Sequence, residues 1–252
     1  GRCLAEVYEL SFTESELAEL NRLSDCGIEN GRGLLWKVEY PAARARGIPP
    51  SYLFGTMHVS DADVLVLPEP VKKARAESSA YCMEVLPEIF LATALGRRMY
   101  TNDEQDSVRS ALIPGDYKRL KKMLLQRGMA EPLIARLKPW GATILLSSPR
   151  RKAGPVLDQM LFDMALAEAK SVCALESIQG HLDTFDKLPR QEQIKMLLHS
   201  MAANKDQKKQ FAFLKKKYLA RNPGAIVCLM QMHGSTSSPG RDLVRKRMLD
   251  QR

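Results

Sequence analysis

Residues 51–85 read SYLFGTMHVSDADVLVLPEPVKKARAESSAYCMEV, and this stretch decides the predicted fold. Its two ends, 51–58 and 80–85, are apolar runs rich in strand-forming residues. Between them, residues 67–80 carry prolines at the start and alanines inside, a pattern that predicts a helix. A further strand-like run, GLLWKVEY at 33–40, comes first, and PAARARGIPP joins it to the next strand as a proline- and glycine-punctuated segment that suits a hairpin loop. The order strand, strand, helix, strand is typical of an α/β layer.

The remainder of the chain is predicted to be largely helical. Residues 88–150 carry apolar faces at helical spacing, and residues 180–221 return to the same pattern. Between these regions, an amphipathic helix leads into a fourth strand-like run at 171–176. We therefore expect an α/β (α+β) fold in which a small central β-sheet is flanked by helices, with a large, mostly helical insertion at about 88–150. Residues 1–30 read as an N-terminal helical extension, so the main domain is expected to span 31–252.

Length, hydrophobic content and the distribution of charge argue against a membrane-spanning protein and against a nucleic-acid-binding protein. At 252 residues with 45% hydrophobic content, the chain can bury a sizeable core, and no run approaches the roughly 20 apolar residues that a membrane span needs. The net charge of +9 is spread over several separate segments, and the few aromatic residues do not alternate with the basic ones. No nucleic-acid partner is therefore expected. Solvated basic helix faces leave peripheral association with a membrane open, and nothing in the sequence indicates an oligomeric state.

The cysteines do not suggest a structural metal site, because no two of them have Cys-x-x-Cys spacing. Cys82 and Cys173 each lie in an apolar strand-like run, and we expect both to be buried thiols. Cys3 and Cys26 flank a short helical segment near the N-terminus and could pair in an oxidising compartment. The sequence leaves open whether that pair forms.

Three of the predicted strands end on a titratable residue: His58, Glu84 and Glu176. In an open α/β sheet, ligands bind outside the carboxyl ends of the strands, where these side chains would converge. Taken singly, a histidine or a glutamate at such a position is more often structural, solvated or helix-capping. An imidazole and two carboxylates at one edge, however, form the composition of a divalent metal site or of a general acid–base cluster. The sequence predicts one of these two.

The blocks around these residues resemble a known family. GLLWKVEY, PSYLFGTMHVSDADVLVLPEPVKKA and AYCMEV are similar to the opening of the TraB/GumN family, which includes the TIKI metalloproteases and the PrgY pheromone-shutdown proteins. The similarity continues at KPWGATILL, VLDQMLFDMALAEAKSVCALES and LDTFDKLPRQEQ, and it spans about residues 32–252. The resemblance implies an α/β core with helical insertions, as in the erythromycin-esterase-like and ChaN-like folds. It also implies a dependence on a divalent metal of the manganese or cobalt type, as in TIKI members.

Carried onto this sequence, the family pattern assigns roles to the strand-end residues. GTMH is the form taken here by the family's first Gly-x-x-His motif, so the resemblance implies that His58 is catalytic and binds the metal. Glu84 in CMEV and Glu176 in ALES match two family glutamates, which are expected to share that catalytic and metal site. Gly55 would let the backbone approach the site closely, and Thr56 beside it is expected to contribute to substrate binding.

Two further residues are expected near the substrate. Asp158 in VLDQ matches an acidic residue at the start of a family helix, and its alternative interpretation is an N-cap. His181 stands where family members usually carry glutamine. It could add an imidazole to the site or cap the following helix, and we favour the cap.

The family's second Gly-x-x-His motif has no counterpart in this sequence. The run CLMQMHGS offers His233 at the end of an apolar segment but lacks the glycine three residues earlier. KKKYLARNPGAIVCLMQ and RDLVRKRMLDQR match the helices before the family's Arg-Asn signature, and the sequence stops at the matching arginine, Arg252. We therefore expect the domain to be truncated before its second histidine, which would leave an open and weaker metal site.

These observations favour a metal-dependent hydrolase, specifically a peptidase of the TraB/GumN/TIKI type that acts on a peptide or protein. The alternative is a non-catalytic binding protein on the same scaffold that sequesters a peptide signal or a haem-like ligand. A third interpretation is an interaction scaffold without chemistry. The resemblance also implies a periplasmic or extracellular location, and because the sequence starts at Gly1 a leader is not visible in it.

Overall fold

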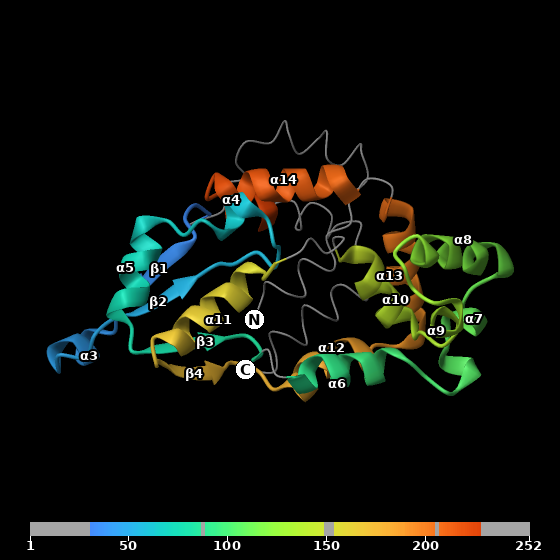
Figure 1. Cartoon of the computed structure of the whole chain (residues 1–252), viewed down its shortest axis with the longest axis horizontal. Coiled ribbons are helices and arrows are strands. Elements are labelled where there is room, and N and C mark those ends of the chain that lie inside the picture. The colour runs from blue at the N-terminus through green and yellow to red at the C-terminus, as the bar shows by residue number, and fades with distance from the viewer. Residues whose placement is uncertain (1–30, 87–88, 149–153, 205–206, 228–252) are drawn as a thin grey trace.

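The computed structural model of the chain describes residues 31–86, 89–148, 154–204 and 207–227 (Figure 1). In chain order its elements are β1 (Leu35–Val38), α3 (Pro41–Ala45), β2 (Ser51–Phe54), α4 (Ala62–Leu65), α5 (Glu69–Glu77), β3 (Ala80–Met83), α6 (Ile89–Met99), the 3-10 helix η1 (Glu104–Asp106), α7 (Val108–Ala111), α8 (Pro114–Leu125), α9 (Glu131–Ala135), α10 (Pro139–Ser147), α11 (Leu157–Ala167), β4 (Ser171–Ala174), α12 (Ile178–Asp186), α13 (Arg190–Ala203) and α14 (Gln207–Leu219). Short strands and helices alternate up to β3, and helices follow from α6 to α11. This order confirms the α+β class and the helical insertion.

Several expectations concern residues outside the described ranges. The N-terminal extension with Cys3 and Cys26 lies outside them, and so do His233 and Arg252. The predictions made for these residues therefore stay predictions.

β1 and β2 form the expected antiparallel hairpin, in which Leu35 lies opposite Phe54. The sequence predicts a loop between the two strands, but the linker holds the short helix α3. Pro41 occupies its first turn, where the fixed φ of proline suits a helix, and alanines and arginine follow. Gly47, with a φ of +71°, then turns the chain toward β2.

β3 and β4 form a second pair, which is parallel and aligns Ala80 with Ser171. The sequence predicts one small central sheet, whereas the strands of the described residues form two separate pairs. β2 ends at Phe54, short of the predicted residue 58. Beyond the strand, the backbone N–H of Val59 donates to the carbonyl of Met57 at 2.7 Å, which closes a tight turn centred on His58. Helix α11 packs against both strands of the parallel pair.

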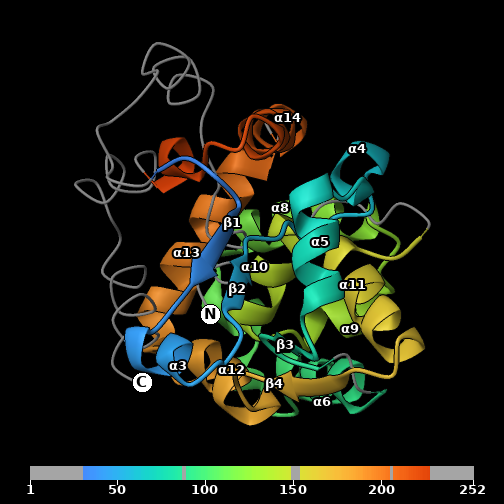
Figure 2. The same cartoon turned by 90° about the vertical axis from the view of Figure 1, so that its left-hand side faces the viewer.

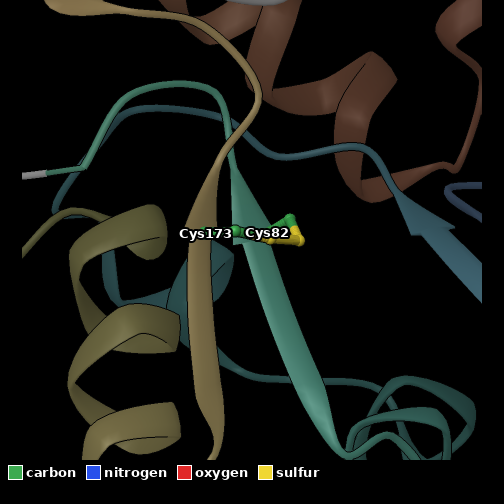
Figure 3. The surroundings of a disulfide bond; sticks show 2 residues. All are labelled: Cys82 and Cys173. Carbon is green, nitrogen blue, oxygen red and sulfur yellow. A yellow bond between two sulfur atoms is a disulfide. The ribbon is translucent and has the colours of Figure 1, made fainter.

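Cys82 and Cys173 lie opposite each other in the parallel pair and form a disulfide (Figure 3). Their Cα atoms are 4.5 Å apart, within the range that a disulfide spans. The expectation of two buried thiols is therefore wrong. Side chains alternate along β3, so Tyr81 and Met83 lie on the more covered face while Cys82 lies on the exposed one. The bond joins the strands on either side of the helical insertion.

Two hydrophobic cores stabilise the two halves of the molecule seen in Figure 1. The helical core is built from α6 to α10, α12 and α13, where the fully buried Trp140 stacks on Phe185 with ring centroids 6.1 Å apart. The sheet-side core lies among β1, β2, α4, α5, α11 and α14 and includes Leu157, Leu161 and Phe213. Figure 2 shows β1, β2 and α5 at the near end of the molecule, with α8 and α10 behind them.

A carboxylate at the edge of the helical core joins three helices. Asp186, at the end of α12, accepts hydrogen bonds from Trp140 Nε1 at 3.0 Å and from Lys138 Nζ at 2.7 Å, both at the start of α10. It also binds Arg98 Nη2 of α6 at 2.6 Å, and Asp183 binds Nη1 of the same guanidinium at 2.7 Å. The blocks KPWG and LDTFD, far apart in the sequence, are therefore held together by charge and by packing.

Gly141 lies where helix α10 packs closely against helix α6. A Cβ at this position would lie 3.0 Å from the Cβ and from the carbonyl oxygen of Met99 on α6, whereas a Cβ at Gly96 of α6 would meet no atom within 4 Å. Alanine gains about 1 kcal/mol of helix propensity at either position. We expect Gly141→Ala to be about 2 kcal/mol less stable than Gly96→Ala, because overpacking costs about 1–3 kcal/mol. Urea unfolding measures the difference, and equal stabilities would contradict the close approach of α6 and α10.

Candidate functional site

His58 lies on a tight turn between β2 and α4. After Phe54 the chain passes through Gly55 into a three-residue turn whose central residue is His58, closed by the bond from Val59 to Met57. Met57 and Val59 are each only 5% exposed and pack into the sheet-side core. Because both neighbours of His58 point into this core, its imidazole is directed to the other side, against the start of α11.

A buried carboxylate fixes the imidazole of His58. The Nδ1 atom lies 2.5 Å from Oδ2 of Asp158, and the hydroxyl of Thr56 donates to Oδ1 of the same carboxylate, also at 2.5 Å. The Nε2 atom of His58 is buried and has no hydrogen-bond partner among the described residues. With a proton on Nδ1 shared with Asp158, the neutral ring presents the lone pair of Nε2 to a proton or to a metal ion.

Asp158 belongs to the first turn of α11 and does not cap that helix. The N-cap is Val156, which has no capping side chain, so the N-cap interpretation of Asp158 is wrong. Burial by itself raises the pKa of Asp158, but the hydrogen bond and the charge interaction with His58, followed by the hydrogen bond from Thr56, outweigh burial and bring the pKa below its ordinary value. Asp158 is therefore an anion at neutral pH, which makes it a strong acceptor for the ring N–H.

Tyr81 of β3 is part of the same surroundings, although it is not among the site residues predicted from the sequence. Burial, and after it the negative charge of Asp158, raises the pKa of Tyr81 well above its ordinary value, so the phenol stays protonated. The signal that could have revealed Tyr81 is the alternation along β3. This alternation directs Tyr81 and Met83 to one face and Ala80 and Cys82 to the exposed face.

Glu84 and Glu176 lie side by side at the carboxyl ends of β3 and β4, where the backbone N–H of Glu176 donates to the carbonyl of Glu84 at 2.9 Å. The Oε2 atom of Glu176 is 3.3 Å from Nδ1 of His181, whose ring is buried on α12 and meets the edge of the Phe185 ring. The cap of α12 is Ser177, so the interpretation of His181 as the cap is wrong. Its imidazole belongs instead to the glutamate end of the parallel pair.

The candidate residues thus fall into two groups, one around His58 and one around Glu176. No three histidine, cysteine, aspartate or glutamate side chains in the described part of the chain are arranged to hold a metal ion. The buried Nε2 of His58 fits a metal donor, but Glu84 and Glu176 are not gathered with it into one coordination sphere. At Gly55 a Cβ would meet Leu34 at 3.8 Å, an ordinary contact, so these surroundings do not by themselves demand glycine.

The fold and the site define an α+β protein that carries a Gly-x-x-His motif with its histidine fixed by a carboxylate. A family model for the TraB/PrgY/gumN family matches residues 34–252, and the chain belongs to this family. Searches of curated proteins and of solved structures found no significant match. No helix within the described ranges is long and apolar enough to cross a membrane.

The contacts of Asp158 predict a stability that depends on pH. Because the native pKa of Asp158 is lowered, its contribution is complete above the unfolded pKa of about 3.9 and is lost as the pH falls through the native pKa. Asp158→Asn lacks this contribution. We expect it to lower the free energy of unfolding by about 2 kcal/mol at pH 7, and by progressively less below about pH 4.

Asp163→Asn is the matched control, since Asp163 is an exposed carboxylate on the same helix that is hydrogen-bonded to Gln159. Denaturant unfolding at several pH values should show a smaller effect for this variant. A loss of stability in Asp158→Asn that is the same at pH 3 as at pH 7 would contradict the lowered pKa.

Proposed function

We propose that the protein is a hydrolase that cleaves peptide bonds, with His58 as the residue that moves the proton. The observation that carries the proposal is the state of the two ring nitrogens: Nδ1 lies 2.5 Å from Asp158, while Nε2 is buried without a partner among the described residues. Leaving a buried polar atom unpaired costs free energy, and such atoms occur where a ligand or a reacting group completes the pairing. Membership in the TraB/PrgY/gumN family, through the GTMH motif, supports the same assignment.

In this proposal His58 is a general base that Asp158 holds in place. The carboxylate accepts the Nδ1–H bond and so selects the tautomer in which Nε2 carries the lone pair. The Nε2 atom takes a proton from water as the water oxygen attacks the peptide carbonyl carbon. The protonated ring, stabilised by the Asp158 anion, then gives this proton to the amine nitrogen as the C–N bond breaks.

The same nitrogen is the donor that a divalent ion of the manganese or cobalt type would use. Such an ion supplies a water of lowered pKa. A carboxylate on the second ring nitrogen, as Asp158 is here, is the usual partner of a metal-binding histidine. The residues that the structure describes offer no group of three donors at this place, and Glu176 contacts His181, so we derive no step through an ion.

Peptide hydrolysis by the full-length protein tests the proposal. We expect cleavage of members of a peptide library, and a loss of about 10²- to 10⁴-fold in kcat/KM for His58→Ala, because the base is removed. Asp158→Asn should lower kcat by about 10- to 100-fold with little change in KM, because the ring loses its orientation but the substrate surface stays. His199→Ala, on α13 in the helical half, is the matched histidine control and should keep full activity.

Chelation separates the two roles of His58. Activity that survives a chelator and still requires His58 identifies the ring as a base, whereas activity restored only by added manganese or cobalt identifies it as a ligand. Cleavage that is unchanged in His58→Ala would refute both roles. Peptides that bind without being cleaved, under every metal condition, would support a binding protein instead.

We also propose that the protein works in an oxidising compartment, either periplasmic or extracellular. The disulfide between Cys82 and Cys173 supports this location, since disulfides persist in such compartments and are rare in a reducing cytosol. Protein isolated from cells after thiol blocking should yield, on non-reducing digestion, one peptide pair linked through these two cysteines. Finding both cysteines blocked as free thiols would contradict the bond and the location together.

A further inference from the structure

A small cavity in the helical half is lined by two arginines. It has a volume of about 390 Å³ and lies between the C-terminal part of α6 and helix α9. Arg97 of α6 and Arg136, the C-cap of α9, line it together with Tyr100 and Leu133. Among the described residues, no aspartate or glutamate is part of the lining. Cavities of a few hundred Å³ hold small molecules in many proteins.

The two neighbouring arginines of α6 differ in their partners. Arg98 is paired with Asp183 and Asp186. Arg97 is exposed at the cavity, and no hydrogen bond or ion pair joins its guanidinium to another residue in the described part of the chain. A basic residue in the last turn of a helix interacts favourably with the helix dipole, which accounts for one positive charge here. It does not account for the second guanidinium or for the hollow between them.

Arg136 is held in place before any ligand arrives. Its Nη2 donates to Oδ1 of Asn102 at 2.5 Å, and its Nε donates to the carbonyl of Thr101 at 3.4 Å. The backbone N–H of Thr101 in turn donates to the carbonyl of Arg136 at 2.9 Å, so the two walls of the cavity are tied together. An ordered guanidinium loses less conformational entropy on binding than a free one, which favours affinity.

The carboxylates nearest in sequence have other partners. Asp103 caps η1, with its Oδ1 accepting the backbone N–H of Gln105 at 2.9 Å. Glu131 of α9 is paired with Lys121 of α8. Neither carboxylate forms an ion pair with Arg97 or Arg136 in the described part of the chain.

We infer that this cavity binds a small soluble molecule through a phosphate or carboxylate group, with Arg97 and Arg136 as the anion-binding side chains. A planar guanidinium matches the two oxygens of such a group with parallel hydrogen bonds. Tyr100 and Leu133 supply an apolar wall for the remainder of the molecule. The site is built from elements of the helical core, whereas His58 packs on the sheet side, so the inference does not depend on the proposed hydrolase activity.

Calorimetric titration of the full chain with inorganic phosphate and with citrate, at constant ionic strength, tests the inference. We expect saturable one-to-one binding of at least one of these anions, weakened about tenfold or more by Arg97→Gln, because a charge-assisted hydrogen bond is lost. Arg109→Gln on α7 removes the same charge from an exposed arginine outside the cavity and should leave binding unchanged.

Gly96→Leu provides a variant that fills the cavity without removing a charge. A Cβ at this position meets no atom within 4 Å, and leucine is a better helix former than glycine, so the fold should be retained. Binding of the anion should be lost.

Titration with vesicles containing phosphatidylglycerol tests whether the two arginines bind a soluble anion or the anionic surface of a membrane.

Three results would overturn the inference. The first is no saturable binding of either soluble anion. The second is equal weakening by Arg97→Gln and Arg109→Gln, which would indicate general attraction to the positive chain. The third is binding to the vesicles but to neither soluble anion, which would assign the arginines to a membrane surface.

Discussion

The carboxylate of Asp158 is the contact on which the geometry of the site depends. It joins helix α11 to a turn that lies 100 residues earlier in the sequence, through His58, and it also accepts the Thr56 hydroxyl. A buried carboxylate costs free energy unless hydrogen bonds compensate its lost hydration. Thr56 and His58 provide two such bonds, and the first turn of α11 adds the positive end of a helix. The hydrogen bonds that compensate for the burial of this charge also orient His58. The same bonds therefore contribute to the stability of the fold and to the geometry of the site.

The helical half also contains a carboxylate that binds side chains from distant segments, but the partners of this carboxylate are different. Asp186 also collects side chains from distant segments, but its ionic partners, Arg98 and Lys138, are permanent cations. Burial raises the pKa of Asp186, but the bonds to Lys138 and Arg98 bring it below its ordinary value. The negative charge of Asp186 is therefore paired with cations of the protein itself. The principal partner of Asp158 is a ring whose second nitrogen is buried and has no hydrogen-bond partner among the described residues. Asp186 therefore joins segments of the fold, whereas Asp158 joins segments of the fold and also orients a histidine ring.

Local patterns predicted the elements well, because helix and strand periodicity is carried by neighbouring residues. The β1–β2 hairpin, α5, α11 and the helical insertion all follow from such patterns. The division into two strand pairs does not, since no local pattern of residues shows which strands pair with which. The disulfide was missed for a related reason. Cys82 and Cys173 look like core residues in an apolar run until the register of the parallel pair is known.

The rule that ligand-binding residues follow strand ends was useful only where the strands are paired. It brought Glu84 and Glu176 together correctly, because β3 and β4 are adjacent and parallel. It grouped His58 with them because it assumed a single sheet. The partner of His58 is Asp158, whose place at a helix start looks the same in sequence whether the carboxylate caps the helix or reaches a distant loop.

The spacing of the GTMH motif has a physical reason in this chain. The backbone N–H of Gly55 still donates to Leu34 at 2.8 Å, as the last bond of the hairpin ladder, and His58 follows three residues later at the centre of the turn. In the extended segment between them, alternate side chains point to opposite sides. Met57 enters the sheet-side core, while Thr56 and His58 both reach the same carboxylate. A shift of one residue would direct the ring of His58 into the core and bring an apolar side chain against Asp158. The spacing of the motif therefore ends the hairpin at Gly55 and places Thr56 and His58 where both can bind the Asp158 carboxylate.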